Sequence, residues 1–311
     1  MEKTLIVYAS RYGSTAQSAK LIARVLGPCD VADVEHMESV TQDVYSNVVL
    51  MSGIYKGGPS QSMLDFIEGH AQWLETKKVA VVSASLGGKD KNNVKMTDRL
   101  TKVAASLAIG GLEDPDTMNE EDRSGLEAFY IKMGGQLLYK DTRDIAQIMQ
   151  TALNIKMAFE DTEDGLTESE DEKAAEIERF IMSHTTCSLA TASVLGVRNT
   201  PLGYSYIDGI FYFVSEGGEK FAHMALSDDV SLCIYDEFEP QKPVRGLQVS
   251  GKAKIFEEGS DEQRSALLKM KLDDEAGSAG LNCFAVIPDS FEFLASEHAN
   301  KGLRAKQVLV K

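Results

Sequence analysis

Short apolar runs alternate with amphipathic runs over the first half of the chain, and this alternation constrains the fold more than any other feature. Residues 5–9 and 47–52 are continuous apolar runs, which are typical of strands buried on both faces. Residues 15–26 and 60–73 have helical spacing instead. We therefore expect an α/β doubly wound parallel sheet with helices on both faces. Further strands are expected at 31–34, at 79–83 and from 108, and further helices at 94–107 and 141–157.

A change of composition follows this half. Residues 160–178 are rich in Asp and Glu and nearly free of aromatic residues. The first part of this run cannot bury a hydrophobic core, so it is typical of a solvated linker. We expect a first domain at 1–158, an acidic linker at 159–173 and a second domain at 174–311, which opens with a helix at 172–182.

The second half has a different pattern, in which many short strands follow one another. Asp208-Gly209 is a strong signal for a two-residue hairpin turn. Strands at this spacing predict a mainly antiparallel small barrel. The expected strands are 187–192, 202–207, 210–215, 230–236, 247–256, 283–287 and 291–294, with helices at 219–226 and 261–272.

Charge and composition exclude several classes of protein. The net charge is -16, which opposes binding to a phosphate backbone, so no nucleic-acid partner is expected. No apolar run is long enough to span a bilayer, and the N-terminus lacks the features of an export signal, so we expect a cytoplasmic protein. The four cysteines form no Cys-x-x-Cys pair and the five histidines have no metal-ligand spacing, so no dedicated metal site is expected.

The loop after the first predicted strand has the composition of a phosphate-binding turn. Its backbone N–H groups and the positive end of the following helix point at one place, and Gly13 lets the backbone turn closely around a ligand. Neither a Gly-Lys-Ser/Thr sequence nor a Gly-x-Gly-x-x-Gly sequence is present, so NTP or dinucleotide binding is not indicated. A plain strand-to-helix turn with a capping serine stays open as the alternative. The candidate residues are Ser10, Arg11, Tyr12, Gly13, Ser14 and Thr15.

Residues 4–26 resemble the opening of flavodoxins, in which a Ser/Thr-x-x-Gly-x-Thr pattern holds the phosphate of FMN without a positive side chain. Two later loops fit the same family, at the ends of strands where open α/β sheets bind ligands. In flavodoxins these loops cover the two faces of the isoalloxazine ring. The resemblance implies FMN in the first domain, with the two loops contributing Gly53, Ile54, Tyr55, Lys56 and Gly57, and Ser85, Leu86, Gly87 and Gly88.

Within this superfamily the chain is most similar to the flavodoxin-type protoporphyrinogen oxidases, through the loop at 53–57 and the stretch 132–135. Those enzymes carry a basic insertion, whereas residues 113–123 of this chain are mostly acidic. The difference argues against a porphyrinogen substrate and a quinone partner. Lysines near the flavin would favour the anionic hydroquinone and raise its potential, unless they only aid solubility. These lysines are Lys56, Lys89 and Lys91.

Residues 180–309 resemble the pyridoxamine 5'-phosphate oxidase-like split barrels, through the stretches 188–191, 200–204, 211–215 and 247–253. Such barrels pair as homodimers and hold FMN in the groove between two chains. The resemblance implies that Ser215 and Lys220 grip the FMN phosphate, that Tyr204 and Ser205 lie along the flavin, and that Gln248 reaches FMN from the partner chain.

Each of these residues has a simpler interpretation. Lys220 is alternatively a surface lysine of its helix, Gln248 an outward residue of an edge strand, and Tyr204 a packing residue. His223 lies one helical turn from Lys220 and either lines the same groove or packs in the structure. The vitamin oxidases hold pyridoxamine phosphate with a further C-terminal segment that has no counterpart here, so this reaction is not expected.

The two resemblances together predict an FMN-dependent oxidoreductase, with one FMN in the flavodoxin-like domain and a second in the split barrel. Electrons would pass between the two sites, from an unidentified donor to a small-molecule substrate or acceptor. No Ser-His-Asp or Cys-His arrangement marks a catalytic residue. Two alternatives stay open: an electron-transfer flavoprotein or flavin-binding module without its own substrate, and a flavoenzyme acting on haem or porphyrin.

Overall fold

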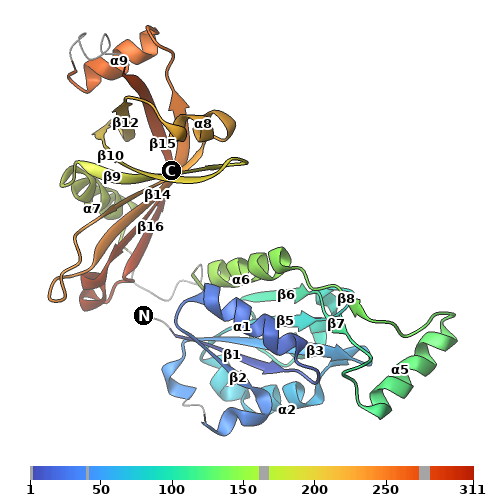
Figure 1. Ribbon diagram of the computed structural model, residues 1–311. Helices are drawn as coiled ribbons and strands as arrows, with labels where there is room; N and C mark the ends of the chain where they lie inside the picture. The colour runs from blue at the N-terminus through green and yellow to red at the C-terminus, as the bar shows by residue number, and fades with distance from the viewer. Residues whose placement is uncertain (1–2, 40–41, 161–167, 273–280) are drawn as a thin grey trace. The chain divides into compact units, whose positions relative to one another are not determined.

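The computed structural model describes residues 3–39, 42–160, 168–272 and 281–311, and these divide into two compact units (Figure 1). The units are Met1–Asp164 and Gly165–Lys311. Residues 161–167 of the proposed acidic linker lie outside the described residues. None of the described helices is both long enough and apolar enough to cross a membrane.

The first unit is built on a parallel sheet in the order β2-β1-β3-β5-β6. Helices α1 and α6 share an apolar core with one face of this sheet, and α2 shares a core with the other face, so the predicted doubly wound α/β architecture is confirmed. The strands are β1 (Thr4–Ala9), β2 (Cys29–Asp33), β3 (Asn47–Tyr55), β4 (Gly58–Pro59), β5 (Lys78–Ala84), β6 (Ala105–Ile109), β7 (Leu112–Glu113) and β8 (Lys140–Asp141). The helices are α1 (Ser14–Leu26), α2 (Gln61–Gly69), α3 (Ala71–Glu75), α4 (Val94–Thr97), α5 (Glu120–Lys132) and α6 (Ile145–Glu160), with short 3-10 turns η1 (Val34–Ser39), η2 (Gln42–Val44) and η3 (Asp90–Asn93).

The helix predicted at 94–107 is wrong. Helix α4 ends at Thr97, and the last part of the predicted segment is strand β6. Strand β6 pairs with β5 through Ala80 to Ala84, and the side chain of Asn93 donates a hydrogen bond of 2.7 Å to the carbonyl of Leu107. Pairing at the sheet edge outweighs the local helical preference of this segment.

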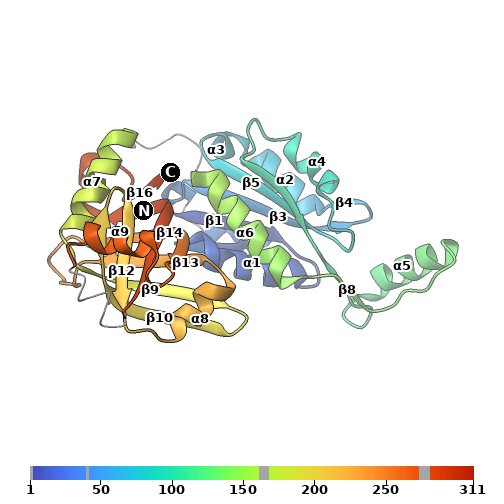
Figure 2. The same ribbon diagram turned by 90° about the horizontal axis from the view of Figure 1, so that it is seen from above.

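Helix α5 was not expected. It begins at a capping Asn119, whose side chain accepts a hydrogen bond from the backbone N–H of Asp122, and it buries none of its residues. The antiparallel pair of β7 and β8 holds the two ends of this excursion together. Figures 1 and 2 show α5 standing away from the sheet of its unit.

The second unit is an antiparallel sheet in the order β10-β9-β13-β14-β15-β12-β11, with β16 paired to β15, and it curls as the predicted split barrel does. Its core contains four completely enclosed phenylalanines, of which Phe213 and Phe284 stack with centroids 4.7 Å apart. The strands are β9 (Thr186–Ser193), β10 (Gly196–Gly203), β11 (Ser205–Ile207), β12 (Ile210–Ser215), β13 (Asp229–Tyr235), β14 (Arg245–Ile255), β15 (Asn282–Ala295) and β16 (Lys306–Val310). The helices are α7 (Glu170–Met182), α8 (Glu219–Leu226), α9 (Asp261–Lys269) and the 3-10 turn η4 (Ser296–Lys301).

The predicted turn at Asp208-Gly209 is confirmed, since both residues have positive φ and Ile207 pairs with Ile210 across it. The two strands predicted at 283–287 and 291–294 are one strand, β15. A bulge in its pairing with β14, at Ser250 and Gly251, lets the strand pass through Pro288 without ending.

Candidate functional site

Three loops of the first unit meet at the carboxyl edge of its sheet. Strands β1, β3 and β5 are neighbours, and their register aligns Ala9 with Ser52 and Ser52 with Ser83. The loops after β1 and β5 therefore begin beside β3, which runs on to Tyr55 and pairs with β4, so residues 53–55 of the predicted second loop are strand. The carboxyl edge is the one at which open parallel sheets bind ligands.

The first loop leaves the N-terminus of α1 open. Gly13 has φ +83, a left-handed conformation in which glycine costs little, and no side chain caps the helix after it. The first N–H groups of a helix lack partners within the helix and carry partial positive charge. The loop between Ala9 and Ser14 thus presents backbone donors to an anion.

Hydroxyl groups of this loop are also placed to bind an anion. Ser10 Oγ is enclosed and has no hydrogen-bond partner within the described part of the chain. Thr15 is buried on the first turn of α1. Because a buried hydroxyl without a partner is costly, Ser10 fits an acceptor such as a phosphate oxygen.

The second loop contacts the first through Tyr55. The hydroxyl of Tyr55 accepts a hydrogen bond of 2.8 Å from the backbone N–H of Arg11, and the Arg11 guanidinium lies 5.1 Å from the Tyr55 ring centroid. The ring passes so close to Gly53 that a Cβ there would lie 2.6 Å from the hydroxyl oxygen. Gly53 therefore allows Tyr55 to reach the first loop.

Helix α5 contributes a residue that sequence reasoning missed. Asp122 Oδ2 accepts hydrogen bonds of 2.5 Å from the Arg11 guanidinium and 2.6 Å from the Tyr12 hydroxyl. The hydrogen bond from Tyr12 lowers the pKa of Asp122 most, and the hydrogen bond from Arg11 comes next. The charge of Lys56 lowers it further. Asp122 is therefore ionised at neutral pH and links α5 to the first loop. No sequence motif marks it, because it lies 111 residues from Arg11.

The third loop is held by residues around β6. The backbone N–H of Ser85 donates to the carbonyl of Ile109 at 3.1 Å, and Gly88 N–H donates to the carbonyl of Ser85 at 3.1 Å. The backbone of Ser85 lies so close to Gly111 that a Cβ there would come within 3.0 Å. Leu86 is half-buried and Gly87 is exposed at the tip of this turn. The tip is therefore accessible to a ligand.

In the second unit, the structure brings Ser215 and Lys220 together around Gly217. Lys220 Nζ donates a hydrogen bond to the carbonyl of Gly217. The backbone N–H of Gly217 donates a weak hydrogen bond of 3.4 Å to Ser215 Oγ. Lys220 is only 5 % exposed, so it is not a solvated surface lysine. Burial first, and then the charge of Arg198, lower the pKa of Lys220.

Arg198 connects this lysine to a groove that the sequence did not indicate. The groove has a volume of about 490 Å³ and a floor of small side chains on β9, β13 and β14, among them Ala190, Ser231 and Ser250, with Arg198 also lining it. This volume is in the range of sites for small ligands. The Arg198 guanidinium forms an ion pair of 3.2 Å with Glu219, next to Lys220 in the chain.

None of the predicted residues of the barrel, Ser215 and Lys220 included, is among the residues that line this groove. The Tyr204 hydroxyl donates to the carbonyl of Ile181 at 2.7 Å, and its ring packs edge-on against Phe211. Ser205 lies on β11, and Gln248 is exposed on β14 opposite Cys233. Their roles toward a flavin stay predictions.

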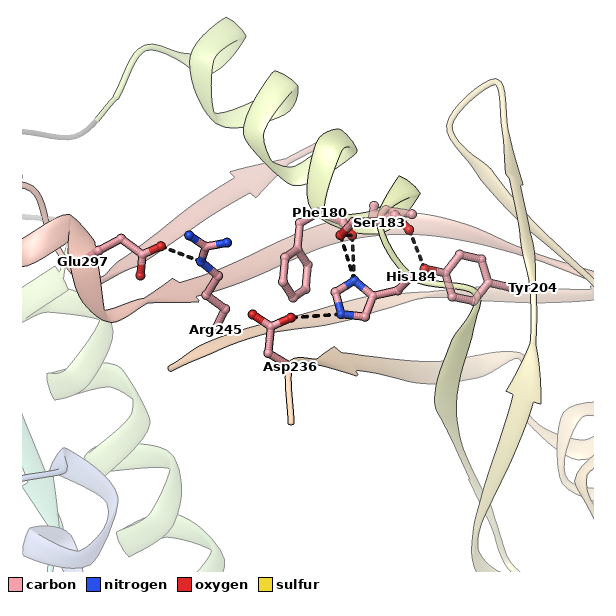
Figure 3. Close-up of polar contacts among 8 residues, drawn as sticks. Phe180, Ser183, His184, Tyr204, Asp236, Arg245 and Glu297 are labelled. Carbon is pink, nitrogen blue, oxygen red and sulfur yellow. Dashed lines mark hydrogen bonds and ion pairs between the residues drawn. The ribbon is translucent and has the colours of Figure 1, made fainter. Parts of the chain in front are cut away.

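A polar cluster near Tyr204 ties α7 to β13 (Figure 3). Nδ1 of His184 lies 2.9 Å from the carbonyl of Phe180, and its Nε2 lies 3.1 Å from Asp236 Oδ1. Both ring nitrogens therefore have partners in the protein. His223, which we considered as a lining residue, is buried with its Nδ1 2.9 Å from Ser193 Oγ.

Comparison with known protein families gives one match for each unit. The flavodoxin domain model matches residues 5–117, and the pyridoxamine 5'-phosphate oxidase model matches residues 174–294. Proteins of both families typically bind flavin. No curated protein matches the chain.

Several solved structures are similar to part of the chain at low identity. A FAD-binding protein from Mesorhizobium loti is 22% identical over 38% of this chain and 89% of its own, with a TM-score of 0.30. HutZ, the heme storage protein from Vibrio cholerae, is 15% identical over 37% of this chain and 88% of its own, with a TM-score of 0.32. ChuZ from Campylobacter jejuni is 14% identical over 56% of this chain and 73% of its own, with a TM-score of 0.37.

The family matches agree with the two sheets in position and in type. They indicate a flavin-related protein. The chain therefore consists of a flavodoxin-like domain, matched over residues 5–117, and a pyridoxamine 5'-phosphate oxidase-like domain, matched over residues 174–294.

Proposed function

We propose that this chain is an FMN-dependent oxidoreductase with one FMN on the flavodoxin-like domain and a second on the barrel. The observation that carries the proposal is the alignment of Ala9, Ser52 and Ser83 at the carboxyl edge of the sheet, with an uncapped helix after Ala9 at one end of it. The uncapped helix N-terminus and the buried Ser10 hydroxyl, which has no hydrogen-bond partner among the described residues, support binding of a phosphate without a basic side chain.

In the first domain, the loop from Ser10 to Thr15 would hold the phosphate and the loops at 53–57 and 85–88 would enclose the ring. The ring of Tyr55 lies beside Gly53, and we propose that it packs against the flat ring of the ligand. FMN supplies the redox chemistry when bound, while the protein sets access and potential.

In the barrel, Lys220 and Arg198 would hold the second phosphate. Burial first, and then the charge of Arg198, lower the pKa of Lys220, and a dianion between the two cations would offset both effects. The groove beside Arg198 has room for a ring system. We propose that a second chain completes this site, and that Ser215, Tyr204, Ser205 and Gln248 contribute to it in the homodimer.

Electrons would pass from one flavin site to the other, and a small molecule would accept or donate them at the barrel. The reaction needs no side-chain nucleophile. Because both domains belong to one chain, each flavin site would meet the other at a higher effective concentration than two separate proteins would.

Anaerobic photoreduction of the purified protein, followed by mixing with a panel of small oxidants, tests this function. We expect one class of acceptor to reoxidise the protein with saturable kinetics. The Lys220→Met variant should keep the first flavin and lose that saturable reoxidation. Equal, unsaturable reoxidation by all acceptors in both proteins would contradict an enzyme and indicate an electron carrier.

A further inference from the structure

A group of metal-ligating side chains lies in the second unit, apart from the groove. Glu168 precedes α7, Glu176 lies on α7, and His298 lies on η4. Each offers one ligand atom, and these atoms all lie within 4.8 Å of one another. We propose that Glu168, Glu176 and His298 bind a divalent transition-metal ion of the Zn²⁺ class.

The histidine is fixed in position, because His298 is completely buried and its ring packs edge-on against Phe293 with centroids 5.9 Å apart. His298 Nε2 lies 2.9 Å from Glu176 Oε2. A buried imidazole beside carboxylate oxygens is a donor set that suits zinc, and three protein ligands leave a position for water.

One oxygen of the second carboxylate has no hydrogen-bond partner within the described residues. Glu168 Oε2 is enclosed and has no hydrogen bond within the described part of the chain. Ligand atoms of Glu168 and Glu176 lie within 4.8 Å of each other, and two carboxylates this close favour the binding of a cation between them.

The geometry requires only small adjustments. Zinc lies about 2.0–2.2 Å from nitrogen and oxygen ligands, so the ligand atoms of one ion lie roughly 3–4 Å apart. The spacing of up to 4.8 Å closes to this range by rotation of the glutamate side chains. Glu168 lies outside the helix, directly before the cap at Ser169, so the helical backbone does not fix its position.

A bound ion would fasten the beginning of α7 to η4. Glu176 and His298 are 122 residues apart in the chain, so no local spacing of ligands signals this site. Because α7 is the first helix of the barrel unit, the ion would stabilise the barrel at the point where the chain enters it.

The test is zinc titration of the chelator-treated full-length protein, followed by calorimetry and by thermal unfolding. We expect one Zn²⁺ per chain at this site and a higher unfolding temperature with zinc. Glu176→Gln and Glu168→Gln should weaken this binding by at least about tenfold, since each removes a charged ligand. Glu178→Gln is the matched control, because Glu178 is exposed on the same helix and outside the cluster.

His298→Ala tests the third ligand, and circular dichroism establishes that it folds. If His298→Ala does not fold, Glu168→Gln still tests the site, because Glu168 is only half-buried. Unchanged zinc binding in Glu168→Gln and Glu176→Gln would overturn the proposal. Absence of zinc binding by the wild-type protein at about 100 µM zinc would overturn it as well, leaving the two carboxylates to share a proton.

Discussion

At Gly13 there is space for a side chain, but the backbone conformation is one that residues with a side chain rarely adopt. Its φ is +83, and a Cβ there would meet nothing within 4 Å. We expect Gly13→Ala to destabilise the protein by about 1–2 kcal/mol through backbone strain alone. Because the loop donors would shift, FMN binding to the first domain should weaken as well. Urea unfolding and FMN titration measure both effects.

Gly125→Ala is the matched control for this substitution. Gly125 also has open space around it, but it lies inside helix α5 with ordinary φ. Alanine there should raise stability by about 0.5–1 kcal/mol and leave FMN binding unchanged. Equal effects of the two variants would show that the backbone of Gly13 has no special role.

Lys220 provides a pH-dependent prediction. Since burial and Arg198 lower the pKa of Lys220, the unfolded chain binds this proton more tightly than the folded protein does. The free energy of unfolding should therefore rise with pH across the interval between that lowered pKa and the ordinary value of about 10.4. A bound phosphate would raise the pKa of Lys220 again, so FMN binding in this interval should take up a proton.

Calorimetry in buffers of different ionisation enthalpy measures this proton uptake, in a series of pH values that descends from the ordinary lysine value. Lys220→Met should abolish it. Lys242→Met removes an exposed lysine that pairs with Glu239 and should behave as the wild type does. Proton uptake that persists in Lys220→Met would place the second phosphate elsewhere.

The residues of the first loop could be predicted from the sequence because glycine and hydroxyl residues at a strand-to-helix turn have a local physical meaning. Asp122 and Arg198 could not be predicted. Asp122 meets Arg11 only because the chain makes a long excursion through α5, and Arg198 meets Glu219 across the turn into α8. Contacts of this kind depend on tertiary structure and leave no pattern in the sequence.

At the scale of elements, the hairpin of β9 and β10 has apolar side chains on an open edge. Strand β10 is the last strand of its sheet, and Val194, Leu195 and Val197 around this hairpin are exposed. An exposed apolar edge strand favours association with another chain. This agrees with our proposal of a homodimer through the barrel.

Val197→Asp should therefore weaken the dimer by at least about tenfold, because it places a charge in an apolar contact. Sedimentation or light scattering should show two chains per particle for the wild type and one for the variant at the same concentration. Val310→Asp serves as the control, since Val310 is equally apolar and exposed at the end of β16. A wild-type monomer, or a dimer unaffected by Val197→Asp, would refute this interface.

Most elements of both halves could be predicted because hydrophobic spacing and turn residues act locally, whereas α5 and most of β10 could not. The helix predicted at 94–107 was wrong because the helical spacing of this segment competes with pairing to β5, and only the folded sheet provides that pairing. Strand β15 was divided in two because Pro288 is a strand breaker in most settings, whereas here a bulge opposite Gly251 accommodates it.

On the scale of the whole molecule, the chain joins two units whose apolar cores are separate. The core clusters of the parallel sheet contain residues up to Phe159, and those of the antiparallel sheet begin at Ile177. Two cores of this size allow each unit to keep its own cofactor site. The central claim is therefore that one chain holds two flavins.

Counting FMN per chain tests this claim most directly. The protein is saturated with FMN, freed of excess by gel filtration, and its flavin is released and measured against protein concentration. We predict two FMN per wild-type chain, with one lost in Gly13→Ala under dilute conditions and the other lost in Lys220→Met. A single FMN per wild-type chain, or loss of the same flavin in both variants, would contradict the account.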